Sequence, residues 1–145
     1  IEPLSEESVN FMVQGLGGTI SKEHANITVS DPEKTAAWMQ TVFGWRIRWQ
    51  GPALNTGYTV HVGTDAQYLA LYCPADRQKT PFDLHGFLGG LSHIGVCVRD
   101  LVACEACVKK SGVYTRDHAE YKSGSRFYFH DIDGIEYEVV SYSFE

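Results

Sequence analysis

The stretch HANITVSD at residues 24–31 returns as HIGVCVRD at residues 93–100, and this repeat decides the fold. Both copies follow the pattern H-x-x-[IV]-x-V-x-D, and they start 69 residues apart, close to half of the 145-residue chain. The alternation predicts strands whose apolar side chains point one way while His24 and His93 point the other. A repeat of this length predicts a duplicated structural module.

Each predicted strand leads into a helix with recognisable ends. Asp31 and Asp100 are suitable N-caps, and Gly44 and Gly112 stand where a left-handed residue would end each helix. Three strand-like runs, separated by turn residues, follow each helix. They lie near residues 45–50, 58–63 and 67–73 in the first copy and near residues 114–121, 126–130 and 136–142 in the second.

The predicted fold class is therefore α+β, built from two βαβββ modules. We place module one at residues 22–74, a linker at 75–90 and module two at 91–143, all within one domain at 22–145. Residues 1–21 form an accessory segment whose apolar spacing predicts a short helix. Neither module is large enough to bury a good core alone.

The composition excludes several classes of protein. With 12 Lys+Arg against 18 Asp+Glu the net charge is −6, and no basic cluster offers a surface for nucleic acid. The apolar runs are too short to cross a membrane, and residues 1–10 carry acids where a signal peptide would carry lysines. We expect a soluble, cytoplasmic protein. Its four cysteines are too few for a disulfide framework, and Cys104 and Cys107 are expected to be small helix residues.

The repeat breaks at the end of the modules in an informative way. Glu138 in the second copy aligns with Ala70 in the first, so the repeat carries two histidines, His24 and His93, but one glutamate. Two imidazoles and one carboxylate bind a divalent ion such as Fe, Mn, Zn or Ni and leave coordination positions open. The sequence predicts one such metal ion per site.

With these residues the chain resembles two-module members of the vicinal oxygen chelate superfamily. This superfamily includes glyoxalase I, extradiol dioxygenases, methylmalonyl-CoA epimerase, and the fosfomycin- and bleomycin-resistance proteins. The resemblance covers about residues 22–143 and rests on the repeated opening and on the run FYFHDIDG at residues 127–134 followed by Glu138. It implies sheets that curl around a metal cleft with His24, His93 and Glu138 as ligands. It also implies that modules pair within a chain or across a homodimer.

The resemblance suggests roles for further residues. Ala70 cannot coordinate a metal, which disfavours the four-ligand glyoxalase I and epimerase types and favours the two-histidine, one-glutamate members. Tyr128 shares strand parity with Arg126 and His130, so it can face the metal, and Tyr128 and His118 are the candidates for proton transfer. The expected substrate pocket is lined by Asn26, Tyr68, Ala70 and Tyr72.

These residues favour a metal-dependent enzyme that acts on a small substrate through two adjacent oxygens, with dioxygenase-like or lyase/isomerase chemistry. The alternative is a non-catalytic drug-binding protein of the bleomycin-resistance type, which suits the acidic charge and the aromatic residues. A structural zinc site without activity is a third possibility. The sequence leaves the substrate, the metal and the use of oxygen open, and also whether the site lies within one chain or across a dimer.

Overall fold

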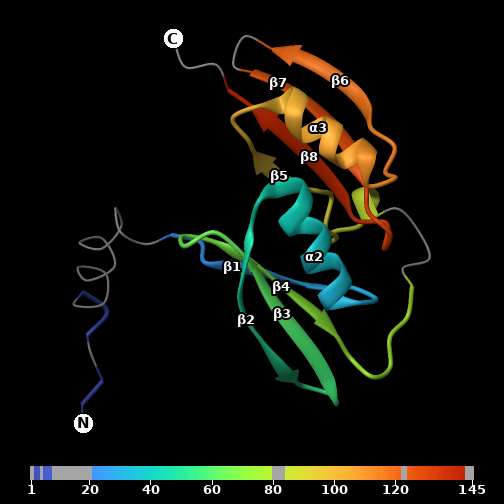
Figure 1. The fold of residues 1–145 in the computed structure, drawn as a ribbon. Helices are drawn as coiled ribbons and strands as arrows, with labels where there is room; N and C mark the ends of the chain where they lie inside the picture. The colour runs from blue at the N-terminus through green and yellow to red at the C-terminus, as the bar shows by residue number, and fades with distance from the viewer. Residues whose placement is uncertain (1, 4, 8–20, 80–83, 122–123, 143–145) are drawn as a thin grey trace.

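The computed structural model describes residues 2–3, 5–7, 21–79, 84–121 and 124–142. The accessory helix predicted at the N-terminus lies largely outside these residues. The two modules follow each other in the predicted order, with a short 3-10 helix in the linker (Figure 1). The first module consists of β1 (His24–Thr28), α2 (Pro32–Phe43), β2 (Arg46–Ala53), β3 (Gly57–Gly63) and β4 (Tyr68–Cys73); the linker holds η1 (Leu84–Gly86); the second module consists of β5 (Ile94–Cys97), α3 (Leu101–Lys110), β6 (Arg116–Tyr121), β7 (Gly124–His130) and β8 (Glu136–Ser141).

Each module forms its own four-stranded mixed sheet. The strand orders are β1-β4-β3-β2 in the first sheet, called sheet A below, and β5-β8-β7-β6 in the second, called sheet B. In both sheets the first strand of the module runs parallel to the last, and the other neighbours are antiparallel. The identical topology confirms the duplicated βαβββ architecture.

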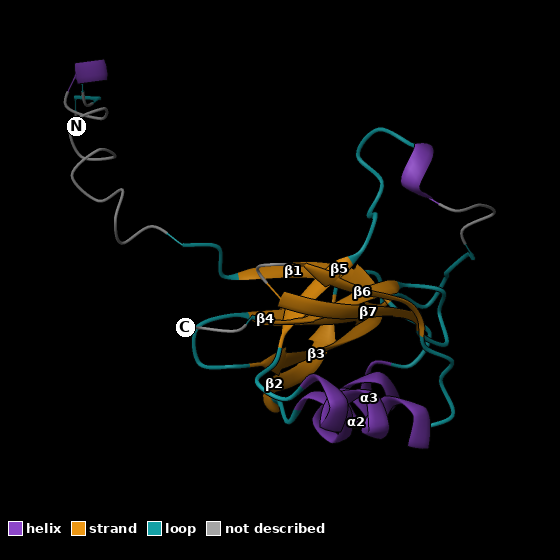
Figure 2. Cartoon of the chain, turned by 90° about the horizontal axis from the view of Figure 1, so that it is seen from above, coloured by secondary structure: helices purple, strands orange, loops and turns teal. Residues whose placement is uncertain are grey.

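The helices of both modules lie together on one side of the strands (Figure 2). Helix α2 contacts α3 as well as strands β2, β3 and β4 of its own module. Because side chains alternate along a strand, each sheet has one face toward the helices and one face away from them. The histidines of the repeat lie on the faces away from the helices, which we call the outer faces.

The predicted helix caps are confirmed. The Asp31 carboxylate accepts a hydrogen bond from the Lys34 amide at 3.1 Å, and Asp100 accepts one from the Ala103 amide at 3.0 Å. These bonds satisfy amide groups that a helix N-terminus leaves without partners. After helix α2, Gly44 adopts the left-handed φ of 69° that a glycine tolerates best.

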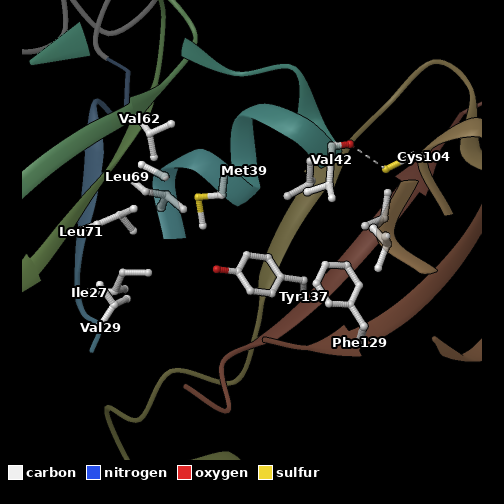
Figure 3. Close-up of a cluster of buried hydrophobic side chains, with 14 of the residues drawn as sticks. Ile27, Val29, Met39, Val42, Val62, Leu69, Leu71, Cys104, Phe129 and Tyr137 are labelled. Carbon is white, nitrogen blue, oxygen red and sulfur yellow. Dashed lines mark hydrogen bonds between the residues drawn. The ribbon is translucent and has the colours of Figure 1, made fainter. Parts of the chain in front are cut away.

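Side chains from both sheets meet around helix α2 in one hydrophobic core (Figure 3). Trp38 of α2 packs edge-on against Phe129 of β7 and Tyr137 of β8, with ring centroids 5.6 and 5.8 Å apart. The Cys104 thiol of α3 donates to the Val42 carbonyl of α2 at 3.5 Å. The helix of module one therefore helps to bury the sheet of module two, as expected for modules that are small on their own.

The closing run of module two builds the turn before β8. The carboxylate of Asp131 accepts hydrogen bonds from the amides of Asp133 and Ile135 and from the Tyr137 hydroxyl, at 2.9, 3.0 and 3.2 Å. Gly134 has a φ of 80°, which closes the turn. Burial raises the pKa of Asp131 against the opposing effect of these hydrogen bonds. Asp131 thus shapes the entry into the strand that carries Glu138.

No helix in the described part of the chain is long and apolar enough to cross a membrane. All four cysteines are free thiols. Cys104 is buried in the helix interface, where burial raises its pKa to about 11, whereas Cys107 is exposed. This arrangement fits the prediction that the pair are ordinary helix residues.

Candidate functional site

Strand register relates the two outer faces residue by residue. Asn26 of β1 pairs with Ala70 of β4, and Gly95 of β5 pairs with Glu138 of β8 in the same way. Each of these β1 and β5 residues stands two positions after a histidine of the repeat. The strand registers therefore confirm that Ala70 and Glu138 occupy equivalent positions in the two sheets, as the sequence predicted.

On sheet B the outer face brings His93, Glu138 and Tyr128 together. His93 Nε2 lies 3.0 Å from Glu138 Oε2, and the Tyr128 ring stands edge-on to the His93 ring with centroids 6.2 Å apart. Tyr128 pairs with Glu138 in the β7–β8 register. Burial raises the pKa of Tyr128, and its hydrogen bond to the Glu138 carboxylate raises it further. The Tyr128 hydroxyl therefore keeps its proton at neutral pH.

An arginine completes this cluster. Arg126 lies two residues before Tyr128 on the same face of β7, and its Nη1 donates to Glu138 Oε1 at 2.6 Å. Arg126 also interacts with Tyr128. The side chains of Arg126 and Glu138 are 19% and 13% exposed, so their ion pair is largely shielded from solvent. Glu138 thus lies between a guanidinium on one oxygen and an imidazole on the other.

On sheet A the outer face holds His24 with different neighbours. Glu23 Oε1 lies 2.9 Å from His24 Nδ1 and also accepts a hydrogen bond from the Tyr68 hydroxyl at 3.2 Å. The hydrogen bonds with His24 and then with Tyr68 lower the pKa of Glu23, so its carboxylate stays ionised. A carboxylate on Nδ1 favours the imidazole tautomer that leaves Nε2 as a metal-binding lone pair.

His24 is also the first ring of an aromatic row across all four strands of sheet A. The neighbouring pairs His24–Tyr68, Tyr68–His61 and His61–Trp49 have ring centroids 4.8, 4.7 and 5.2 Å apart. The Arg48 guanidinium lies 4.6 Å from the centre of the Tyr68 ring. Burial lowers the pKa of His61, and the nearby His24 and Arg48 lower it further, so His61 is neutral at neutral pH.

A second carboxylate on the outer face of sheet B anchors the linker. Glu136 Oε1 accepts a hydrogen bond from Arg116 at 2.5 Å, while Glu136 Oε2 lies 2.7 Å from His85 Nε2 of η1. Arg116 is also paired with Asp117 and contacts His130. Burial opposes ionisation of Glu136, but its bonds with Arg116 and His85 prevail and lower its pKa. This group fixes the linker to the sheet.

The donor set at His93 and Glu138 fits part of a metal site. Two ligands about 2.1 Å from a shared ion in tetrahedral or octahedral geometry stand about 3.0–3.4 Å apart, and these two donor atoms are 3.0 Å apart. The third predicted ligand, His24, belongs to the separate cluster on sheet A. Among the described residues of one chain, no three His, Cys, Asp or Glu side chains are close enough to hold a metal.

The other predicted site residues are distributed between the faces. Asn26, Tyr68, Ala70 and Tyr72 all lie on β1 or β4 in sheet A, where the Tyr72 hydroxyl donates to the Leu54 carbonyl of the β2–β3 turn at 2.9 Å. His118 is not brought to Glu138. Its Nε2 lies 2.5 Å from Glu105 of α3, and its ring contacts the core residue Phe127, so it points toward the helices.

A bulge explains the direction of His118. The β6–β7 register shifts between Arg116 and Ala119, and Asp117 there has a φ of 55°. A bulge adds a residue to one strand and so reverses the parity of the residues that follow. Residues two positions apart on a regular strand share a face. Because of the bulge, Arg116 points to the outer face whereas His118 points toward the helices.

Sequence reasoning gave no role to Arg126, Glu23, His61 or Trp49. Parity already placed Arg126 on the side of Tyr128, and the repeat makes His61 the counterpart of Tyr128, because His61 pairs with Ala70 as Tyr128 pairs with Glu138. The position of Trp49 had no such signal, because β2 contains a register shift between Ile47 and Trp49.

Two four-stranded mixed sheets with one helix each, and a histidine at the same position of both, define a paired βαβββ protein. The profile of the Glyoxalase/Bleomycin resistance protein/Dioxygenase superfamily matches residues 22–139. The chain belongs to this superfamily. Comparison with curated protein sequences gives no match.

Solved structures with the same fold have varied descriptions. A glyoxylase/bleomycin resistance protein/dioxygenase domain from Frankia sp. EAN1pec is 19% identical, with a TM-score of 0.71 over 86% of this chain and 98% of that one. TnmS3, an antibiotic binding protein from Streptomyces sp. CB03234, is 19% identical, with a TM-score of 0.62 over 86% and 98%. The fosfomycin resistance protein FosX from Listeria monocytogenes is 14% identical, with a TM-score of 0.64 over 86% and 94%. At these identities the likeness concerns the fold.

Proposed function

We propose that this protein is a metal-dependent enzyme that acts on a small substrate able to chelate a divalent ion through two adjacent oxygens. The observation that carries the proposal is the distance of 3.0 Å between His93 Nε2 and Glu138 Oε2. The equivalent of His93 in the first module is also a histidine, His24. The three side chains are the predicted ligand set for Fe, Mn, Zn or Ni.

The proposed site needs two copies of the chain. Within one chain His24 belongs to the Glu23–Tyr68 group and is separate from the His93–Glu138 pair. The side chains of His24 and His93 are 42% and 37% exposed, so both remain accessible to a partner. We therefore infer a homodimer in which His24 of one copy completes the pair on the other.

The residues around the pair then have defined tasks. A divalent ion held there would act as a Lewis acid on the chelating oxygens of the substrate. Tyr128, whose pKa is raised by burial and by its bond to Glu138, would donate a hydrogen bond to a substrate oxygen and not act as a base. Glu23 would keep the His24 tautomer that leaves Nε2 available. His118, which points toward Glu105, is left without a catalytic task in this scheme.

The test compares two glutamates on the same face of β8. Glu138→Gln should lower the affinity for Mn²⁺ or Ni²⁺ by at least about 100-fold, because loss of a ligand should exceed the 10- to 100-fold effect of losing a ligand's hydrogen-bond partner. Glu136→Gln is the matched control, since Glu136 also lies between a histidine and an arginine. It should retain the affinity within about threefold.

Metal content of anaerobically purified protein and calorimetric titration with each metal supply the readouts. Near-stoichiometric metal in the wild type, lost in Glu138→Gln only, supports the proposal. A wild-type protein that neither contains nor takes up metal overturns it, as does loss of binding in Glu136→Gln but not in Glu138→Gln. Sedimentation of the same samples tests the dimer, and a metal-binding monomer would refute the shared site.

A second candidate function has its own support. The aromatic row of sheet A ends at Trp49, which is 52% exposed, and such a surface suits a planar drug held without catalysis. One solved structure of this fold is described as an antibiotic binding protein. Titration with bleomycin, followed by tryptophan fluorescence, separates the two functions. Tight binding that is unchanged in Glu138→Gln favours sequestration.

A further inference from the structure

A β-bulge places an arginine over the aromatic row of sheet A. The β2–β3 register shifts between Ile47 and Trp49, so Arg48 is an extra residue in β2. Neighbouring residues of a regular strand point to opposite faces, but a bulge relaxes this alternation. Arg48 and Trp49 consequently both reach the outer face. There the guanidinium lies 4.6 Å from the centre of the Tyr68 ring, and the centroids of the indole and the His61 ring are 5.2 Å apart.

The Trp49 indole is exposed but has a defined place on this face. It packs over Gly51, where a Cβ atom would come within 2.8 Å of the indole Cζ2. Side chains do not approach each other so closely, so the position of the ring depends on the missing side chain of Gly51. The ring is 52% exposed in this position. A rigid aromatic surface loses little conformational entropy when a planar ligand stacks on it.

Arg48 carries a charge that is not neutralised by direct contact within the described part of the chain. There Arg48 forms no hydrogen bond or ion pair, and its contact is with the face of the Tyr68 ring. The carboxylates of Glu23 and Asp65 act on Arg48 only at longer range. Glu23 is hydrogen-bonded to the aromatic row, and Asp65 is paired with Arg46. The N–H groups of Arg48 are therefore available to a bound anion.

Arg48 and Trp49 together define a class of ligand. A guanidinium presents several donors in one plane and matches a carboxylate with two parallel hydrogen bonds. Aromatic rings stack on planar groups. A cationic group, by contrast, would be repelled by Arg48. Although the whole chain has a net charge of −6, this part of its surface favours an anion.

We infer that the outer face of sheet A around Arg48 and Trp49 binds planar aromatic anions such as aryl carboxylates, with the rings holding the aromatic group and Arg48 selecting its charge. This inference rests on the binding role of the aromatic row in the second candidate function, and it adds a charge requirement to that role. It needs no metal ion and does not involve the His93–Glu138 pair.

Three ligands of nearly the same shape test the charge requirement. 2-Naphthoate is an anion, 2-naphthamide is neutral and 2-naphthamidine is a cation. Dissociation constants are measured by two-dimensional NMR titration of protein treated with a chelator, and the Trp49 indole signal, assigned with Trp49→Phe, locates the site. The wild type should bind naphthoate about fivefold or more tightly than naphthamide, because a charge-assisted hydrogen bond is stronger than a neutral one. Naphthamidine should bind most weakly.

Two arginine variants assign this order of affinities to a residue. Arg48→Gln should bring the naphthoate and naphthamide affinities within about twofold of each other, because the charge that distinguishes them is removed. Its affinity for naphthamide should stay within about threefold of that of the wild type. Arg99→Gln is the matched control, because Arg99 is an exposed arginine of module two and its loss changes the net charge equally. This control should retain the order.

A third variant tests the aromatic part of the site. Gly51→Ala should weaken the binding of all three ligands by about threefold or more and keep their order, since the added methyl group displaces the indole without changing any charge. Trp49→Ala removes the ring itself and should weaken binding at least as much, so it supplies the result if Gly51→Ala does not fold. Unchanged binding in Trp49→Ala overturns the inference.

The remaining outcomes separate the inference from the functions proposed above. Equal affinities of the wild type for naphthoate and naphthamide overturn the role of Arg48 and leave the aromatic row as a neutral binding surface. An order that persists in Arg48→Gln, or that is lost in Arg99→Gln, also overturns this role. If none of the three ligands binds, the second candidate function falls together with the inference. Metal uptake is tested separately by the comparison of Glu138→Gln with Glu136→Gln.

The same face could instead be covered by a second copy of the chain, and sedimentation of the variants distinguishes this case. A ligand site predicts that Arg48→Gln and the wild type have the same oligomeric state. Loss of a dimer in Arg48→Gln would identify the face as a protein interface and overturn the inference.

Discussion

The two modules share one topology but differ in the face that carries most of their aromatic rings. Sheet B turns three rings toward the helices, those of Phe127, Phe129 and Tyr137, which are fully buried, while Tyr128 stands on its outer face. In sheet A the register-equivalent positions hold the aliphatic residues Val60, Val62 and Leu69. The outer faces differ in the opposite sense. The outer face of sheet A carries the aromatic row that starts at His24, and the outer face of sheet B carries ion pairs.

This exchange gives the two sheets of a duplicated fold different inner and outer faces. The larger rings of sheet B fill the space against helix α2, as the contacts of Trp38 with Phe129 and Tyr137 show. Their burial frees the outer face of sheet B for charged side chains held by β7 and β8. Sheet A has smaller side chains at the equivalent inner positions and carries its aromatic row on the outer face. A duplicated module can therefore diverge by exchanging the characters of its two faces without changing its strand order.

The largest effect of this difference should concern the core. Phe129→Ala should lower the free energy of unfolding by about 4 kcal/mol, because it removes a fully buried ring that contacts Trp38, Phe43 and Tyr137. Val62→Ala at the equivalent position of sheet A should cost about 2 kcal/mol, since fewer buried atoms are lost. Urea denaturation of both variants gives the two values. Equal losses of unfolding free energy would show that the two inner faces contribute equally to stability.

A smaller difference should appear at the two histidines. Glu23 and Ser92 stand directly before His24 and His93, and each lies near an imidazole Nδ1, at 2.9 and 3.3 Å. Glu23→Gln should weaken metal binding about tenfold, because the ionised carboxylate fixes the imidazole tautomer and increases its basicity. Ser92→Ala, which removes a longer and uncharged contact, should change the affinity by less than about threefold. Calorimetric titration with Ni²⁺ measures both. The reverse order of effects would contradict the role given to Glu23.

The parts of this architecture that could be predicted from sequence depend on local patterns. The strand–helix openings, the aspartate caps and the equivalence of Ala70 and Glu138 all follow from neighbouring residues or from the repeat, and the structure has each of them. The fold could be derived because a duplicated pattern specifies its topology twice.

Contacts across strands could not be derived in this way. The pairing of Arg126 with Glu138 depends on register and on rotamers, neither of which has a sequence signal. The bulge at Asp117 turns His118 toward Glu105 and reverses a parity that the sequence takes as unbroken. Sequence parity also cannot tell whether His24 meets the His93–Glu138 pair in the same chain, because that depends on how the two sheets are placed relative to each other.

The smallest expected effect concerns a feature that the two modules share. Asp31→Ala and Asp100→Ala should each lower the free energy of unfolding by about 1 kcal/mol, because each removes one N-cap hydrogen bond of nearly the same length. Serine at either position should restore most of the loss, since its hydroxyl also accepts from the helix amide. Thermal and urea unfolding of the four variants measure these losses. A clearly larger loss at one helix would mean that its N-terminus has a further task in packing the modules, and the divergence of the two modules would then extend beyond the faces of their sheets.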